Sequence, residues 1–438
     1  MNVTASPAWA EPKAMQQIPP LRHYLPFVLF FILICTPGFT NIASVNFSVA
    51  IFPFVLYGYG LGARSALSQL LPGARTLVVA ILSLLLLICG WSFLTAIGVD
   101  SFVRVFRPIY GHASGLAIVL AILALSRSVD AAKRTQVVCL TILTLTLAAT
   151  YFIGDRGYGD RYPGFFKHPN QLGPVASMTA LFFFCQVLSM PIRKVTLPLI
   201  GMLIAVYAIF LSGSKTTLLT FAGLSILSVP LLAFQNLNAR KAIIEIYRNM
   251  TIASGALLFG LLILPIINAR AFSVLDDIFA GDEEVNQYGS VVARGGLWKE
   301  SWEMALAHPW TGVGAGQLMS DGTEHSHNVF MDAMRTIGFP GLGLTIAFIV
   351  TVIWYGQGAY RAGRQLSRDP HSPLALEGAR GPFVGSLIAL LSYLISNQMS
   401  DSFGPSTIPF FYMFMAFSFT YLAFPRQHQK AAAFSPAS

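Results

Sequence analysis

The chain has 438 residues, of which 55% are hydrophobic and only 11% are charged. A soluble domain carries about a quarter charged residues, so this composition excludes a water-soluble globular protein. The net charge of +9 is spread over short basic stretches and not gathered on one polar face, which argues against nucleic acid as a partner.

The hydrophobic residues form twelve blocks, and a helix that crosses a bilayer needs roughly 20 such residues. Backbone in lipid must satisfy its own hydrogen bonds, and the blocks lack the alternation of barrel strands. We therefore predict an all-α integral membrane protein with about 12 transmembrane helices. The blocks are residues 24–40, 42–60, 76–98, 110–126, 135–153, 171–190, 195–211, 216–234, 249–268, 337–357, 383–400 and 405–424.

The charges indicate how these helices are oriented. With the N-terminus in the cytoplasm, 18 of the 28 Lys and Arg residues lie on inner segments and 14 of the 19 Asp and Glu residues on outer ones. The positive-inside rule favours this orientation, and an even number of crossings returns the C-terminus to the cytoplasm. The predicted parts are an inner tail at 1–23, nine helices at 24–268, a long outer loop at 269–336, three helices at 337–424 and an inner tail at 425–438.

The outer loop at 269–336 is the longest connection in the chain, and connections of this length are usually functional. Arg294, Trp298 and Trp302 are spaced four apart, so on a helix they share one face. Because tryptophan favours the membrane interface, we predict that this helix lies along the outward-facing surface of the cytoplasmic membrane. The glycine-rich stretch at 312–316 is predicted to form a flexible turn after this helix.

The loop ends in the sequence Glu-His-Ser-His-Asn, directly before an apolar block. Histidine titrates closest to neutral pH and accepts protons from hydroxyl groups, so His327 and His325 are candidate general bases. Three carboxylates are candidates to orient the ring, namely Glu324, Asp332 and Asp401. A zinc site and idle, solvated histidines are the alternatives, but zinc requires a third ligand that no pattern in the sequence supplies.

Basic residues also lie on other outer segments. Residues 154–173 contain Arg161 and His168, and the turn Ser-Gly-Ser-Lys-Thr-Thr places Lys215 at the start of a helix. That turn lacks the spacing of a nucleotide-binding loop, although a lysine with hydroxyls at a helix start suits phosphate. Each cation can anchor its helix to lipid headgroups. Alternatively, these cations and Arg294 converge with one histidine and bind a diphosphate leaving group.

Taken in order, these motifs resemble the O-antigen ligase and polymerase superfamily. The resemblance rests on the long outer loop with Arg-x-x-x-Trp, the glycine-rich turn, His-x-His-Asn before a span, and Phe-x-x-His-Pro-Asn-Gln-Leu-Gly at 165–173. It implies a metal-independent glycosyltransferase of the bacterial inner membrane with its active site facing the periplasm. Such an enzyme transfers a glycan from undecaprenyl diphosphate, and the acceptor of a ligase is a lipid A–core sugar.

The resemblance also implies roles for single residues. Arg294 matches the arginine that begins the loop helix, and His327 matches the histidine before asparagine. Lys215 departs from the pattern, in which an arginine after serine is usual, and lysine binds phosphate only as a point charge. His168 stands where asparagine is more frequent, so its role is open.

The predicted site combines both lines of reasoning. Its catalytic residues are His327, His325 and Asp401, and its diphosphate-binding residues are Arg161, Lys215, Arg294 and His168. Transfer is expected to invert the anomeric carbon, because the loop shows no carboxylate pair suited to a covalent intermediate. No cofactor or metal is expected. The expected partners are the lipid-linked glycan, the lipid A–core acceptor and membrane lipids, and the chain is expected to be a monomer or weak oligomer.

Three other functions are alternatives. An O-antigen polymerase or a protein O-oligosaccharyltransferase would use the same donor with a different acceptor. A polysaccharide or lipid transporter would suit twelve crossings. However, coupled transporters usually place ionisable residues within their spans, and the predicted spans contain no Asp, Glu, Lys or Arg.

We predict that topology reporters fused near Arg134, Arg240 and Arg364 are cytoplasmic, because those segments are rich in basic residues. Reporters near Gly157 and Gly281 are expected to be periplasmic. Alkaline phosphatase and fluorescent-protein fusions at the same five sites measure this. A cytoplasmic signal at Gly281 would contradict the predicted chemistry, because the long loop would face the wrong compartment.

Overall fold

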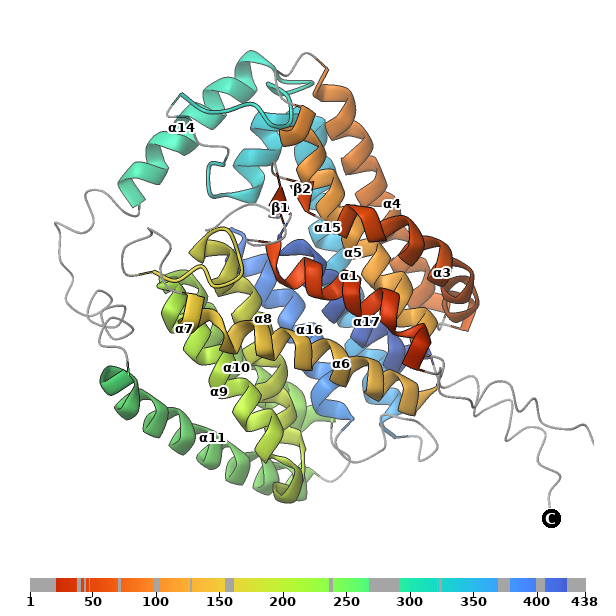
Figure 1. Ribbon diagram of the computed structural model, residues 1–438, viewed down its shortest axis with the longest axis vertical. Coiled ribbons are helices and arrows are strands. Elements are labelled where there is room, and N and C mark those ends of the chain that lie inside the picture. Colours follow the sequence, from red (N-terminus) through yellow and green to blue (C-terminus); the bar gives the residue numbers. More distant parts are fainter. Residues whose placement is uncertain are drawn as a thin grey trace, which may run out of the picture.

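The computed structural model describes residues 21–37, 41–42, 45–46, 48–69, 72–97, 102–126, 128–153, 161–235, 239–267, 291–320, 322, 325–368, 379–398 and 406–423. These residues form a bundle of helices (Figure 1). The first helices are α1 (Leu25–Cys35), α3 (Ser48–Gln69), α4 (Pro72–Thr95), α5 (Phe102–Leu125), α6 (Val129–Ala148) and α7 (Thr150–Ile153). The later ones are α8 (Pro169–Ser189), α9 (Thr196–Ser212), α10 (Lys215–Gln235), α11 (Ala239–Ile267), α14 (Val291–Ala307), α15 (Val329–Leu366), α16 (Arg380–Ser396) and α17 (Ile408–Ala423).

Each predicted apolar block overlaps a helix, as expected for backbone that must satisfy its hydrogen bonds without water. Five helical segments in the described residues are both long and apolar enough to cross a membrane. They are Arg75–Thr95, Val103–Leu125, Pro169–Ser189, Lys215–Ala233 and Val329–Leu366. The chain is therefore a helical multi-pass membrane protein, while the number of twelve crossings and the side on which each terminus lies stay predictions.

Helix α8 is the centre of the bundle. Every side chain from Leu172 to Leu188 is buried, because α9, α10 and α16 pack around this helix. A Cβ atom added at Gly385 of α16 would lie 2.9 Å from the backbone oxygen of Phe182. Small residues of this kind let membrane helices approach closely, where van der Waals packing replaces the hydrophobic effect.

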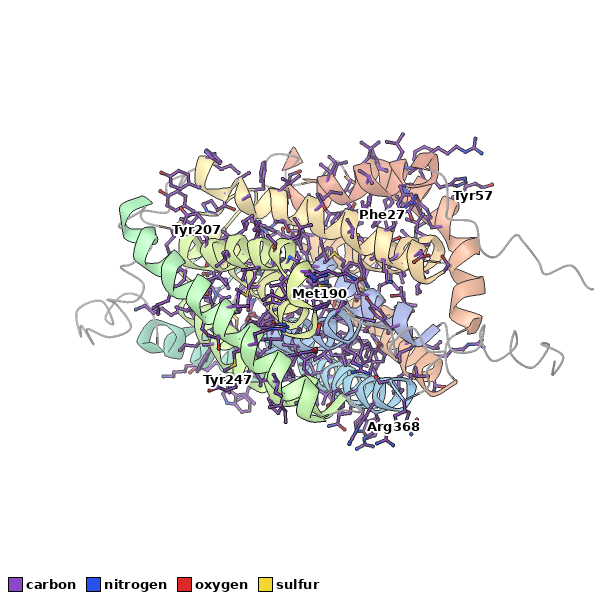
Figure 2. All side chains as sticks on the ribbon, turned by 90° about the horizontal axis from the view of Figure 1, so that it is seen from below. Phe27, Tyr57, Met190, Tyr207, Tyr247 and Arg368 are labelled. Carbon is purple, nitrogen blue, oxygen red and sulfur yellow. The ribbon has the colours of Figure 1, made fainter. Side chains whose placement is uncertain are left out.

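The surface of the bundle is apolar. Helix α4 is buried over only 17% of its apolar window, and Leu86 and Phe93 on this helix are 66% and 55% exposed. Tyr57 and Tyr247 extend away from the bundle in Figure 2 and are 87% and 68% exposed. Large apolar patches are rare on monomeric soluble proteins and are covered by acyl chains in a bilayer.

The first part of the chain contains a short hairpin where a helix was predicted. The helix predicted over 42–60 begins only at Ser48. Before it, β1 (Asn41–Ile42) pairs antiparallel with β2 (Val45–Asn46). Asparagine side chains compete for backbone hydrogen bonds and favour turns over helix, which accounts for the delayed start. Single 3-10 turns at Leu21–His23 and Ile192–Lys194 complete the described elements.

Four helices begin at least six residues earlier than hydropathy indicated, and two of them are α6, which starts at Val129 and not at 135, and α11, which starts at Ala239 and not at 249. Helix α5 starts at Phe102, so Arg104 and Arg107 lie in its first turns and not in a loop. Helix α15 starts at Val329 and not at 337. The predicted outer loop therefore ends in a helical piece at 329–336 that belongs to no predicted span.

The helix predicted in the long loop is present as α14. Its tryptophan face is turned toward α15. The indole of Trp298 donates to the Ser326 carbonyl, and the Trp302 ring lies edge-on to Phe339 with centroids 6.2 Å apart. Trp310, just after the helix, is 75% exposed and is the better candidate for membrane contact. Placement of α14 on the membrane surface stays a prediction.

We predict that Gly385→Ala lowers the thermal midpoint of the protein in detergent, with a loss of about 1–3 kcal/mol from overpacking. The added methyl group must displace the backbone of α8, and this outweighs the better helix propensity of alanine. The matched control is Gly223→Ala on α10, where nothing lies within 4 Å of the new Cβ. Equal midpoints for the two variants would contradict close α8–α16 packing.

Candidate active site

Arg161 joins three segments at one end of the bundle. Its Nε donates to the Ser212 carbonyl at 2.8 Å, and its Nη2 donates to the side-chain oxygen of Asn170. The N–H of Tyr162 donates to the Leu211 carbonyl at 2.8 Å. The last carbonyls of a helix lack partners within the helix, and these bonds supply them for α9. The segment before α8 is thereby fixed to the end of α9.

Lys215 begins α10 on the other side of the same turn. The chain passes from α9 to α10 through Gly213, whose φ of +60° is a conformation that glycine adopts without strain. A Cβ atom added there would lie 2.9 Å from the Cγ of Arg161. The Ser214 hydroxyl accepts from the Thr217 N–H at 3.4 Å and caps α10. Arg161 and Lys215, which are far apart in the sequence, therefore flank one turn.

His168 caps the start of α8. Its Nδ1 accepts from the N–H of Asn170 at 3.1 Å, and Pro169 occupies the first helical position, which suits proline. A ring nitrogen that accepts a hydrogen bond carries no proton, so this cap requires a neutral ring protonated on Nε2. Asparagine is a favoured N-cap residue. Histidine takes this role here because its Nδ1 supplies the same kind of acceptor.

A second group of polar residues lies at the start of α15. Asn328 caps this helix, because its Oδ1 accepts from the N–H groups of Phe330 and Met331 at 3.0 and 3.2 Å. Its Nδ2 donates to the Gln398 carbonyl at the end of α16 at 3.4 Å. Asp332 lies in the first turn, where a carboxylate is favoured by the helix dipole. An asparagine followed by an acidic first turn is a local start signal that could have placed α15 correctly from the sequence.

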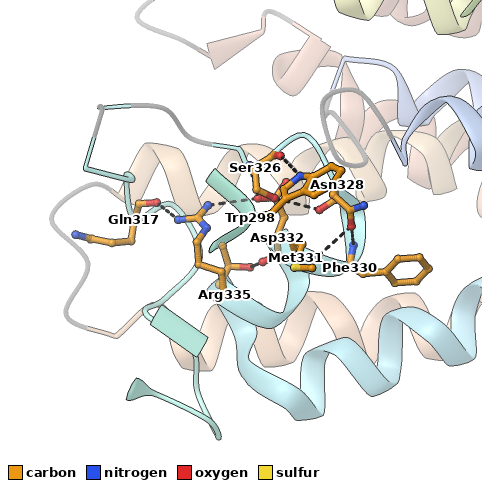
Figure 3. Close-up of polar contacts among 9 residues, drawn as sticks. Trp298, Gln317, Ser326, Asn328, Phe330, Met331, Asp332 and Arg335 are labelled. Atoms are coloured by element: carbon orange, nitrogen blue, oxygen red, sulfur yellow. Dashed lines mark hydrogen bonds and ion pairs between the residues drawn. The ribbon is translucent and has the colours of Figure 1, made fainter. Parts of the chain in front are cut away.

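His327 is the only residue other than glycine with positive φ in the described ranges, at +59°. Such a conformation costs on the order of 1–3 kcal/mol and persists only where the surroundings hold it. Here the Ser326 N–H donates to Asp332 Oδ1 at 2.7 Å, and the Ser326 carbonyl accepts from Trp298 Nε1 at 2.9 Å (Figure 3). Because Asn328 is fixed as the cap, His327 is held on both sides.

Arg335 is fully buried one turn further along α15. Its Nη2 lies 3.6 Å from Asp332 Oδ1, and its Nη1 donates to the Gln317 carbonyl at 2.9 Å (Figure 3). The residue went unnoticed in the sequence because hydropathy assigned it to a loop. The Asp-x-x-Arg spacing, which brings two side chains together on a helix, was the available signal.

The backbone of α15 leaves the helical conformation at Ile337 and Gly338. Pro340 explains this break, because proline has no N–H for the carbonyl of Thr336 and its ring collides with that carbonyl in a regular helix. The N–H of Gly314 donates to the Thr336 carbonyl instead, at 3.1 Å. The break is therefore closed by residues of the preceding loop.

The glycine-rich stretch after α14 is docked on this break, which corrects the prediction of a flexible turn. The Val313 N–H donates to the Arg335 carbonyl at 2.8 Å. The indole of Trp91 on α4 donates to the Ile337 carbonyl at 2.9 Å. Gly312 has a φ of +63°, and a Cβ atom there would overlap the carbonyl oxygen of Arg335. Glycine is required here for close approach of two backbones.

Two further contacts join the neighbouring elements to this loop. Arg104 on α5 donates to the Gly316 carbonyl at 3.4 Å. Glu300 on α14 accepts from the N–H and the hydroxyl of Ser320 at 2.7 and 2.9 Å. The loop between α14 and α15 is thus attached to α5 as well as to its own flanking helices.

Both groups of residues lie at the same end of the bundle. Helix α16 runs antiparallel to α8, since Gly381 at its start packs on Cys185 near the end of α8, while Ser392 and Ser177 are 2.9 Å apart further along. The end of α16 therefore lies where α8 begins. Asn328 contacts this end of α16, which places the start of α15 on the side of Arg161 and Lys215.

The predicted site residues divide into three sets. Arg161, His168 and Lys215 meet around the starts of α8 and α10. His325 and His327, both half-buried, precede α15. The remaining positions are the side chain of Arg294, in the first turns of α14, and the whole of Glu324 and Asp401, and these lie outside the described residues.

The arrangement favours an anionic group beside a proton acceptor. The N-termini of α8, α10 and α15 gather at this end of the bundle, and each carries a partial positive charge. Arg161 and Lys215 add full charges near two of them. Phosphate is bound well by such ends, and a histidine that precedes the third can accept a proton.

Comparison with known proteins found a match in the middle of the chain. Residues 200–346 match the family model described as O-Antigen ligase. The matched region runs from α9 into α15 and contains Lys215, Arg294, His325 and His327. No curated protein matches the chain. Residues 200–346 of this multi-pass membrane protein are therefore similar to the O-antigen ligase family, which supports membership of the O-antigen ligase superfamily.

Proposed function

We propose that this protein is an O-antigen ligase of the bacterial inner membrane. On the periplasmic face, it transfers a glycan from undecaprenyl diphosphate to a hydroxyl of a lipid A–core sugar. The observation that carries this proposal is His327, which lies in the matched region and is held in a strained conformation at the start of α15. Strained residues cluster at active sites, where the surrounding structure maintains them for a functional reason.

His327 is proposed as the general base. It takes the proton from the acceptor hydroxyl while that oxygen attacks the anomeric carbon of the donor glycan. The new carbon–oxygen bond forms opposite the bond that breaks, so the configuration inverts and undecaprenyl diphosphate leaves. A positioned base contributes typically about 10²–10⁴-fold in rate. His325 and Asp401 are proposed to support this step.

The cations are proposed to bind the diphosphate. Charge builds on this group as it leaves, and positioned cations stabilise it without a metal or ATP. Lys215 is the direct contact proposed from α10, and Arg294 the contact from α14. Arg161 and His168 orient the turn and the helix start beside Lys215, as their hydrogen bonds to Ser212 and Asn170 support.

Deletion of the gene, followed by examination of lipopolysaccharide and glycoproteins, tests the proposal. The expected result is lipid A–core without O-antigen, together with accumulated lipid-linked polymer. Core that carries a single repeat would indicate a polymerase. Loss of glycan from proteins alone would indicate a protein O-oligosaccharyltransferase. An unchanged glycan profile with a transport defect would overturn the enzyme proposal.

We predict that His327→Ala and His327→Gly both lower transfer by at least about 10²-fold, because each removes the base. The glycine variant should nevertheless unfold at a higher temperature than the alanine variant. Glycine adopts the observed φ without the steric penalty of about 1–2 kcal/mol that a Cβ atom brings.

Purified protein with lipid-linked donor and lipid A–core acceptor measures transfer, and thermal denaturation in detergent measures stability. Wild-type transfer by either variant would refute the assignment of His327 as base. A lower midpoint for His327→Gly than for His327→Ala would contradict the strained backbone.

We predict that Lys215→Ala raises the KM for the lipid-linked donor, because one positive charge is lost beside the diphosphate. Lys215→Arg should be tolerated, since charge and hydrogen bonding survive, and Arg294→Ala should cost more than Lys215→Arg. The matched control is Lys299→Ala on α14, whose side chain is 79% exposed and pairs with Glu303. An unchanged donor KM in Lys215→Ala would remove Lys215 from the diphosphate site.

A further inference from the structure

A buried ion pair lies directly beside the proposed base. Arg335 has the largest fully buried side chain among the described residues, and Asp332 is only 6% exposed. A buried charge is unfavourable unless it is paired and hydrogen-bonded. Even then, buried ion pairs can often be replaced by apolar residues of similar volume without loss of stability. Stability alone is therefore a weak reason for a buried arginine at this position.

The pair is connected to the backbone that precedes His327. Asp332 Oδ1 lies 3.6 Å from Arg335 Nη2 and also accepts from the Ser326 N–H at 2.7 Å. One carboxylate oxygen thus links the guanidinium to the residue before the base. The other side of the guanidinium donates to the Gln317 carbonyl at 2.9 Å, so Arg335 is itself held in place.

The contacts around Ser326 restrict the peptide groups before His327. The N–H of Ser326 is bound to Asp332, and its carbonyl is bound to Trp298 of α14. The residue after His327 is the cap of α15. The left-handed conformation of His327 therefore depends on contacts made by its two neighbours, and Asp332 supplies the shortest of them.

We propose that Asp332 and Arg335 are positioning residues that hold His327 where it acts as the base. This inference rests on the proposed function, because it needs His327 to take the proton. Neither residue needs to touch the substrate. Asp332 acts through the Ser326 peptide, and Arg335 acts by fixing the carboxylate of Asp332 between Ser326 and Gln317.

Three variants separate the contribution of the Asp332 hydrogen bond from that of the ion pair with Arg335. Asp332→Asn keeps an oxygen that can accept from Ser326 but removes the charge that pairs with Arg335. Asp332→Ala removes both functions. Arg335→Met fills similar volume without charge. The control is Glu300→Gln, which changes another carboxylate that holds the same loop but bonds Ser320 and not the peptide before His327.

We expect Asp332→Ala to lower kcat by about 10²-fold, within the range that a positioned base contributes, with donor KM changed less than about twofold. Asp332→Asn should recover part of this loss, and Glu300→Gln should keep the wild-type kcat. In a His327→Ala background, Asp332→Ala should cause no further loss. Residues that act as a unit are non-additive, whereas an independent structural defect would multiply.

Several results would overturn the proposal. One is a wild-type kcat in folded Asp332→Ala and Arg335→Met. Another is a further loss of the same size when Asp332→Ala is added to His327→Ala. Failure of Asp332→Asn to fold would also overturn it, because the mildest change would then show that the pair maintains the fold. Full activity of His327→Ala is a different outcome, which refutes the base assignment itself.

Discussion

The backbone carbonyls at the break in α15 need hydrogen-bond donors, and the candidate site depends on how they obtain them. Pro340 prevents a regular helix, and each carbonyl that loses its helical partner there must find another donor. The donors come from the stretch after α14 and from the indole of Trp91 on α4. Closing the break therefore fixes the end of the long loop against the bundle. The short helical piece before the break, which carries Asp332 and Arg335, is placed by the same contacts.

A fixed loop end has a direct consequence for chemistry. Loops usually supply functional groups, but the base proposed here must keep its position to within about 0.5 Å. Here the strained His327 lies between the hydrogen-bonded Ser326 peptide and the cap of α15. Its backbone is therefore held as firmly as that of a residue within a helix. The strain is maintained by the ion pair and the tryptophan that surround it.

Arg161 and Lys215 are brought together by a different set of contacts. Arg161 satisfies carbonyls at the end of α9 and, in doing so, packs over Gly213 beside Lys215. His168 caps the neighbouring helix. Arg161 thus completes a helix end and also brings its positive charge close to that of Lys215. The antiparallel packing of α8 and α16 then brings this charge to the end where α15 begins.

The sequence by itself determined that the chain is a helical membrane protein, because long apolar runs are a local property. Its polar interruptions also provided the motifs from which the site is proposed. The start of α15 and its break were also readable from Asn328 and Pro340. Only the tertiary structure decided that Arg161 flanks the turn of Lys215, that Trp298 and Asp332 clamp Ser326, and that Arg335 is buried. The physical reason is that these contacts join segments far apart in the chain, and the burial of Arg335 results from the packing of those segments. Hydropathy carries no information about which polar groups meet.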